Sequence, residues 1–453
     1  MGRGEPVAAA GRGGAPRALT VVPGARAVSG GPSAAPAPRH APGLAALLLA
    51  LGAMSALKGL NTFVDPTASY FYYADYRFGF VARGLVGQLF APALDVLPAG
   101  AHRGLLVAWH FAGLAALLAA LARFAARTVA AMAGRVDVLA AAILLFCSPL
   151  VPSLAYFTAA PDPLLCLLTL AVVASARAGR QALACVVLLV GTLAHQLMVF
   201  LALPLLVLAS LVHARRPAPA VAVALAAGLA ACLIVLAAPA PDARLVGRLV
   251  AHGVPLEDAR RLVQLQLGQG AFEMLGVMAG MWRANPLNGA IALAHGAAAG
   301  AAILAVCLLT PGVLQPVAER MPPAVPARRP RGLLAGLLVT GAALGPLAVL
   351  AFAWDLTRLA ALSAFTAFLT ADLLLRRGEP SVAPPDPTRS SRLATLACGT
   401  LAAAFLCLPF VALWFGGLYQ NDFDPVVRDP LRDLEPIRSA VERFLAFYNR
   451  NGP

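Results

Sequence analysis

The chain consists of long apolar runs separated by short polar connectors, and this pattern limits its fold more than any other feature. A bilayer core about 30 Å thick is crossed by roughly 20 apolar residues in a helix. The pattern therefore predicts an all-α, polytopic transmembrane helix bundle of about 11 spans. The expected spans are residues 43–60, 104–122, 136–150, 163–177, 181–194, 197–212, 218–238, 287–310, 332–352, 356–375 and 393–416.

Composition excludes the soluble alternatives. Only 12% of the residues are charged, compared with about 25% in an ordinary soluble domain. The net charge is +14, but the arginines punctuate the apolar runs instead of forming a basic stripe, so no nucleic-acid partner is expected. The 7 cysteines lie inside apolar runs without metal-ligand spacing, and neither a metal site nor a disulfide framework nor a cofactor is expected.

Three regions follow from the order of these runs. Residues 1–42 are rich in Gly, Ala, Pro, Ser and Arg, which predicts a disordered cytoplasmic tail. Residues 43–416 form the transmembrane helical domain, and its first run is interpreted as a retained helix. Residues 417–453 are predicted to be an extracytoplasmic C-terminal tail with a short helix.

The arginines also predict how the chain is oriented. With the spans above, twenty arginines lie on the side of the N-terminus, whereas five basic residues lie in or beside the short loops of the other side. The positive-inside rule then places the N-terminus in the cytoplasm of a multi-pass inner-membrane protein. The stretch 181–213 is the weak point, because a single span there would invert everything after it. Arginines on both sides of the stretch favour a hairpin with its tip near His195.

The first outer loop, residues 61–103, carries the densest polar and aromatic chemistry. An interfacial amphipathic helix is expected from about Phe80 to Phe90, and a plain aromatic belt at the membrane surface is the alternative. In the functional interpretation Asp75 is catalytic, while Arg77 and Arg83 donate to an anionic headgroup as forked guanidinium groups do. The glycines that follow Arg83 are expected to let that headgroup approach the backbone.

Other outer residues have both a structural and a functional interpretation. Asp162 either caps the fourth span or is a second catalytic acid, and His195 is either a structural donor or a third catalytic group. Asp355 and Arg358 form either a helix-start ion pair or a substrate contact. Two amphipathic pieces in the outer loop 239–286 are expected to lie on the bilayer.

The arrangement of these acids resembles the GT-C superfamily of integral-membrane glycosyltransferases. The run YADYRFGFVARGLVG looks like one found in uncharacterised bacterial polytopic proteins near that superfamily, and PDPLLCLLTL is similar to an acid-Pro-Leu-Leu helix start in those enzymes. The resemblance implies transfer of a sugar from a polyprenyl-phosphate donor at the extracytoplasmic face. In that mechanism Asp75 is the first-loop acid, acting as base or orienting the acceptor, Asp162 is the second acid, and the arginines hold the lipid phosphate. The alternative is a transporter or flippase for an envelope lipid or polysaccharide precursor, in which the same arginines line a path.

Overall fold

The computed structural model describes residues 41–60, 72–78, 84–132, 135–236, 244–263, 271–284, 286–321, 328–351, 356–376 and 389–408. Every regular element in these ranges is a helix, which confirms the all-α prediction for this part of the chain. By its internal contacts the chain divides into residues 1–37 and 38–453, and the described residues all belong to the second unit. The predicted tail 417–453 and residues 1–40 of the predicted N-terminal tail lie outside the described residues.

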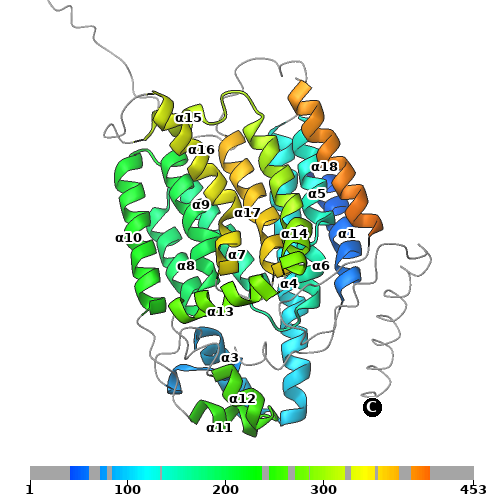
Figure 1. Cartoon of the computed structure of the whole chain (residues 1–453), viewed down its shortest axis with the longest axis vertical. Coiled ribbons are helices and arrows are strands. Elements are labelled where there is room, and N and C mark those ends of the chain that lie inside the picture. The colour runs from blue at the N-terminus through cyan, green and yellow to red at the C-terminus, as the bar shows by residue number, and fades with distance from the viewer. Residues whose placement is uncertain are drawn as a thin grey trace, which may run out of the picture. The chain divides into compact units, whose positions relative to one another are not determined.

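The main bundle is made of helices that overlap the predicted apolar runs, together with α6, which lies between two of those runs (Figure 1). They are α1 (Ala41–Gly59), α4 (Ala99–Ala131), α5 (Val136–Cys147), α6 (Leu150–Tyr156), α7 (Asp162–Arg177), α8 (Gln181–Ala194), α9 (Leu197–His213), α10 (Pro217–Leu236), α14 (Pro286–Leu308), α16 (Arg328–Leu344) with the 3-10 turn η3 (Gly345–Ala351), α17 (Leu356–Leu375) and α18 (Arg389–Cys407).

Shorter helices lie at the ends of the bundle. Figure 1 shows α3 (Gly84–Val96), α11 (Arg244–Ala251) and α12 (Leu256–Val263) together at one end, beside the N-terminal part of α4. The remaining elements are η1 (Tyr76–Phe78), α13 (Ala271–Ala284) and α15 (Gln315–Glu319). The helix α3 confirms a helix in the loop after the first predicted span, and it continues to Val96, beyond the predicted end at Phe90. The helices α11 and α12 coincide with the two predicted amphipathic pieces of the later loop.

Six helical segments among the described residues are long and apolar enough to cross a membrane. They are Ala41–Gly59, Ala99–Ala131, Val136–Tyr156, Pro217–Leu236, Arg331–Ala351 and Leu356–Leu375. By comparison, α8 and α9 have 14 and 17 residues, or about 21 and 26 Å, which is less than the hydrocarbon thickness. Helix length therefore supports a multi-pass membrane protein with six full-length spans, and eleven crossings stay a prediction.

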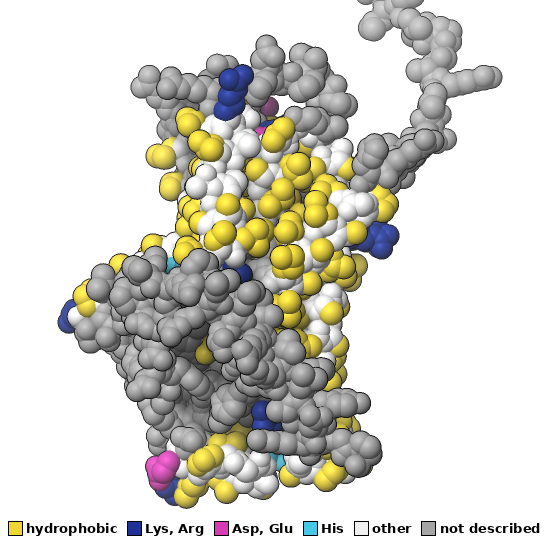
Figure 2. Space-filling model, turned by 90° about the vertical axis from the view of Figure 1, so that its right-hand side faces the viewer, with side chains coloured by type: hydrophobic (Ala, Val, Ile, Leu, Met, Phe, Trp, Pro, Cys, Tyr) yellow, Lys and Arg dark blue, Asp and Glu magenta, His cyan; other side chains and the backbone are white. Residues whose placement is uncertain are grey.

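The outside of the bundle is apolar, as a surface in contact with lipid must be. Hydrophobic side chains cover much of the described surface on the face shown in Figure 2. Met54 on α1 and Leu396 on α18 are 59% and 66% exposed, which is unusual for large apolar side chains in contact with water. These exposed side chains are consistent with burial in a bilayer.

The centre of the bundle is α17, which is buried along its whole length and packs against α14. Two glycines one turn apart on α14 allow the close approach. A β-carbon added at Gly300 would lie 2.3 Å from Ser363 Oγ, and one added at Gly296 would lie 2.5 Å from Ala360 Cβ. Small residues at this spacing let membrane helices pack backbone against backbone.

The stretch 181–213 is two antiparallel helices. Gln181 at the start of α8 donates a 2.6 Å hydrogen bond to Ser210 Oγ near the end of α9. At the other end, a β-carbon on Gly191 would touch Met198. The chain reverses at His195 and Gln196, so the predicted hairpin is confirmed and the single span is excluded.

Contacts at helix ends show which helices run in the same direction. The C-terminal ends of α4, α7 and α17 meet at Asp372, which accepts hydrogen bonds from Thr128 Oγ1 at 2.7 Å and from Arg177 Nη1 at 2.6 Å. Lys58, at the end of α1, donates to the carbonyl of Phe405 at 2.8 Å, near the end of α18. If successive spans alternate in direction, α4, α7 and α17 must run parallel to one another, and α1 must run parallel to α18. The contacts confirm both of these relations. Which side of the membrane each end faces stays a prediction.

Candidate functional site

Asp75 lies in the segment between α1 and α3, and its carboxylate is fully buried. Its Oδ1 accepts hydrogen bonds from the backbone amide of Arg77 at 2.9 Å and from Arg77 Nε at 3.0 Å. Its Oδ2 accepts a third from Arg77 Nη2 at 2.6 Å. Both oxygens are therefore held by one arginine two residues further along the chain.

The segment that contains Asp75 packs closely against α3 because α3 has glycine at the two points of contact. A β-carbon on Gly87 would lie 2.0 Å from the carbonyl oxygen of Ala74, and one on Gly84 would lie 2.7 Å from the ring of Tyr76. Any larger residue at position 87 would push the backbone next to Asp75 away. The space beside these glycines is filled by the chain itself, so the expectation that they admit a headgroup is wrong.

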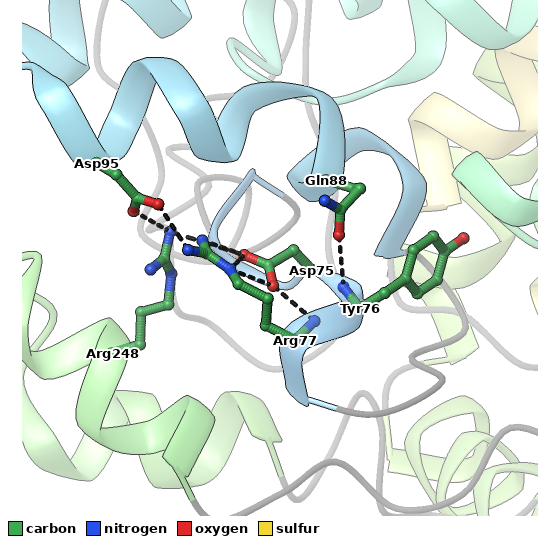
Figure 3. Close-up of polar contacts among 6 residues, drawn as sticks. All are labelled: Asp75, Tyr76, Arg77, Gln88, Asp95 and Arg248. Carbon is green, nitrogen blue, oxygen red and sulfur yellow. Dashed lines mark hydrogen bonds and ion pairs between the residues drawn. The ribbon is translucent and has the colours of Figure 1, made fainter.

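Two further residues complete a network around Asp75 and Arg77 (Figure 3). Asp95, near the end of α3, accepts a 2.6 Å hydrogen bond from Arg77 Nη1. Arg248, on α11, donates to Asp95 at 3.0 Å and lies 3.7 Å from Asp75. The four side chains carry two negative and two positive charges. Sequence reasoning missed Asp95, the only acid in α3, and treated Arg248 only as part of an amphipathic helix.

The network determines the protonation of its acids. Burial alone raises the pKa of Asp75, but the hydrogen bonds and positive charge of Arg77, with the charge of Arg248, outweigh burial and hold that pKa below its ordinary value. The pKa of Asp95 is lowered, chiefly by its hydrogen bond to Arg77. Asp75 is therefore ionised at neutral pH with both oxygens occupied, an arrangement that suits positioning Arg77 better than accepting a proton from a substrate.

An aromatic stack joins α11 to the start of α4. Tyr73 and His252 are stacked, with ring centroids 4.4 Å apart and an angle of 14° between the planes. The ring of His102, on α4, lies 5.0 Å from His252. Burial is the largest cause of a lowered pKa at His252, and the charges of Arg248 and His102 lower it further.

Asp162 and Arg358 form a second group. Asp162 is buried at the first residue of α7, and its Oδ2 accepts a 3.0 Å hydrogen bond from Arg358 Nη1, at the start of α17. The guanidinium carbon of Arg358 also lies 5.2 Å from the ring centre of Phe157. Pro161 holds the N-cap position and makes no side-chain cap bond. Asp162 therefore forms an ion pair that joins α7 to α17, a contact beyond the helix cap expected from the sequence.

The two groups lie at the same end of the bundle. The C-termini of α4, α7 and α17 meet at the opposite end, so His102, Asp162 and Arg358 share this one. Burial raises the pKa of Tyr72, and the charge of Asp162 raises it further. Tyr72, three residues before Asp75, therefore lies within electrostatic range of the second group.

The third predicted catalytic residue, His195, lies at the hairpin tip. Its Nδ1 accepts a 3.1 Å hydrogen bond from the backbone amide of Leu197, which fixes the turn between α8 and α9. The ring thus accepts a hydrogen bond here, whereas the structural interpretation expected a donor, and the catalytic role of His195 stays a prediction. Arg83 and Asp355, both predicted to bind substrate, lie outside the described residues.

A small cavity lies near the start of α7. Its volume is about 50 Å³, and it lies between α4 and α7 and is lined by Trp109, His110, Gly113, Ala160, Pro161, Pro163, Leu164 and Leu167. Pockets that enclose whole ligands usually measure about 300 Å³ or more, so this cavity has no room for a sugar phosphate. Within the described ranges, no group of three or more His, Cys, Asp or Glu side chains is placed to hold a metal ion.

Comparisons with protein-family models, curated proteins and solved structures found no match to this chain.

Proposed function

We propose that the chain is a multi-pass membrane glycosyltransferase that transfers a sugar from a polyprenyl-phosphate donor at the extracytoplasmic face of the inner membrane. One observation carries the proposal. Acids and arginines from helices far apart in sequence are assembled at one end of the bundle, as Asp75–Arg77–Asp95–Arg248 and Asp162–Arg358. Transfer from a lipid phosphate requires a carboxylate near the acceptor and cations near the leaving phosphate.

The arginines at the opposite end of the bundle indicate which side of the membrane the proposed site faces. Arg177, Arg376 and Arg135 lie at the opposite end, where they pair with Asp372 and Asp137. Arginine-rich ends and loops face the cytoplasm under the positive-inside rule, so the proposed site faces outward. The same alternation, with a helix at each predicted run, supports eleven crossings, in which the shorter helices cross a bilayer thinned around them or with their ends at the interface.

The residues take the following parts in the proposed reaction. Asp162 accepts the proton of the acceptor hydroxyl as that oxygen forms a bond to the anomeric carbon of the sugar. The bond from that carbon to the phosphate oxygen breaks, and the lipid phosphate leaves with the electron pair. Arg77 stabilises the charge on the phosphate, and Asp75 holds Arg77 in position. Arg358 orients Asp162.

A transporter or flippase for an envelope lipid is the second candidate, and helix breaks favour it. The helix α5 ends at Cys147, and the chain resumes as α6 after Ser148 and Pro149. Likewise α16 passes into the 3-10 turn η3 at Gly345. Paired discontinuous helices are a feature of secondary transporters. In this alternative the polar end is a gate and no covalent bond changes.

The test is sugar transfer from a polyprenyl-phosphate sugar by the purified, full-length protein in lipid nanodiscs. Asp162→Asn should lower turnover by about a hundredfold, the lower range for loss of a general base. Asp75→Asn should chiefly raise the donor KM, because it releases Arg77. Glu257→Gln is the control, since Glu257 is exposed on α12 and outside both groups. Full turnover with Asp162→Asn would refute the mechanism. Absent transfer by wild type, with movement of the intact lipid across vesicles, would favour the transporter.

A further inference from the structure

Asp95 lies between two arginines in a way that differs from the other carboxylate of its network. Its side chain is 37% exposed, whereas that of Asp75 is 0% exposed. One oxygen of Asp95 accepts from Arg77 at 2.6 Å and the other accepts from Arg248 at 3.0 Å. The two guanidinium groups, from η1 and α11, thus converge on one anionic group at the rim of the site (Figure 3).

The charges of the network show what Asp95 contributes. Asp75 is buried against Arg77 and balances one of the two positive charges. Asp95 balances the other, and without it the rim would carry one net positive charge between two forked donors. Arg77 and Arg248 each donate one hydrogen bond to a different oxygen of Asp95, and a phosphate, which also presents several acceptor oxygens, can be bridged by two arginines in the same way. A carboxylate bridging both arginines occupies the position such a phosphate would take.

The surroundings of Asp95 indicate where the phosphate would come from. Val96, its neighbour in the chain, is 85% exposed, and Leu89, two turns earlier on α3, is 68% exposed. On α11, Val250 is 39% exposed. Large apolar side chains exposed beside a charged network are typical of helices that lie at the membrane interface, where lipid phosphates are found.

We propose that Arg77 and Arg248 form a binding site for the phosphate monoester of an isoprenyl lipid, the group that leaves in the proposed reaction, and that Asp95 is an internal competing anion which this phosphate displaces. The inference rests on the proposed function, and it adds Arg248 as a ligand-binding residue and Asp95 as an autoinhibitory one.

The experiment measures binding of citronellyl phosphate, a soluble isoprenyl phosphate, to the purified full-length protein in detergent by calorimetry. Asp95→Asn removes the competing charge and should tighten binding by about tenfold, equal to about 1.4 kcal/mol. Arg248→Gln removes one fork and should weaken binding by about the same factor in both the wild-type and the Asp95→Asn background. Glu257→Gln removes an equal charge from α12, where the carboxylate is 87% exposed, and should leave binding unchanged.

Several outcomes would overturn the proposal. If Asp95→Asn binds citronellyl phosphate no more tightly than wild type, competition by Asp95 is excluded. If Glu257→Gln gains as much affinity as Asp95→Asn, the effect comes only from the change in overall charge. Inorganic phosphate and citronellol are the remaining arms, and inorganic phosphate binding as tightly as citronellyl phosphate would exclude a lipid ligand. Asp95→Ser, with melting temperatures for all variants, separates a binding effect from misfolding. Tighter binding in Asp95→Asn without any sugar transfer would refute the transferase and retain the phosphate site.

Discussion

Replacing Asp372 by asparagine should destabilise the protein more than any change at the exposed rim of the candidate site. The carboxylate is 0% exposed and accepts contacts from Arg177 at 2.6 Å, Arg376 at 2.6 Å and Thr128 at 2.7 Å. Asparagine of nearly equal volume leaves two arginines, 28% and 17% exposed, without their shared anion. Removing one partner of a buried ion pair costs about 3–5 kcal/mol.

The assay is equilibrium unfolding of the full-length protein in mixed micelles with increasing SDS. Intrinsic fluorescence reports the loss of tertiary structure. Asp95→Asn is the matched comparison, because it removes the same charge from an exposed ion pair and should cost about 1 kcal/mol or less. Asp372→Asn should therefore unfold at a clearly lower SDS fraction than Asp95→Asn. Equal midpoints for the two variants would refute the argument that Asp372 holds the ends of α4, α7 and α17 together.

Three other predictions test separate features. Lys58→Met should lower the unfolding free energy by about 1 kcal/mol, because the ammonium group no longer binds the C-terminal carbonyls of α18, and the same SDS titration measures it. The pKa of His252 lies below its ordinary value of 6.5, so the unfolded state binds the proton first and stability should fall as the pH drops through that value. His252→Gln should therefore flatten the dependence of melting temperature on pH between 7.5 and 5. Parallel curves for the variant and the wild type would contradict this. A cysteine at Gln315 should react with an impermeant maleimide only after permeabilisation and one at Glu257 in intact cells, in a background without other accessible cysteines, and the reverse pattern would invert the topology.

Much of the fold could be predicted because the signals are local. The hairpin at 181–213 follows from arginines at both of its ends, and the directions of the helices follow from counting apolar runs. Which helices touch was not predictable from one sequence. The contact of Gly300 with Ser363 depends on the packing of α14 against α17, and neither residue marks its partner in the chain.

In the candidate site, too, the contacts between residues close in sequence were predictable and the long-range contacts were not. Asp75 and Arg77 are two residues apart, and sequence reasoning selected both. Asp95 and Arg248 are separated by 153 residues, and only the folding of α11 onto α3 brings them together. Asp95 is the only acid in the apolar segment that forms α3, and this was the signal that could have drawn attention to it, because an acid in an apolar segment usually needs a partner.

Two ion pairs, one near each end, join α7 and α17 and agree with the parallel direction of these helices. On α7, Asp162 at the start and Arg177 at the end both agree with the helix dipole, whereas on α17, Arg358 near the start and Asp372 near the end both oppose it. The charges of α17 are balanced by partners: α7 supplies one for each of them, and Arg376, just after α17, supplies a second for Asp372. The paired residues are separated by about 22 Å along α7 and about 21 Å along α17 at 1.5 Å per residue. A slide of one turn, about 5.4 Å, would break both pairs. If α7 and α17 both cross the bilayer as predicted, both spacings are shorter than the roughly 30 Å hydrocarbon core, and at least one pair then lies at a depth where an unpaired charge is costly. The two ion pairs therefore limit how far α7 and α17 can slide along each other.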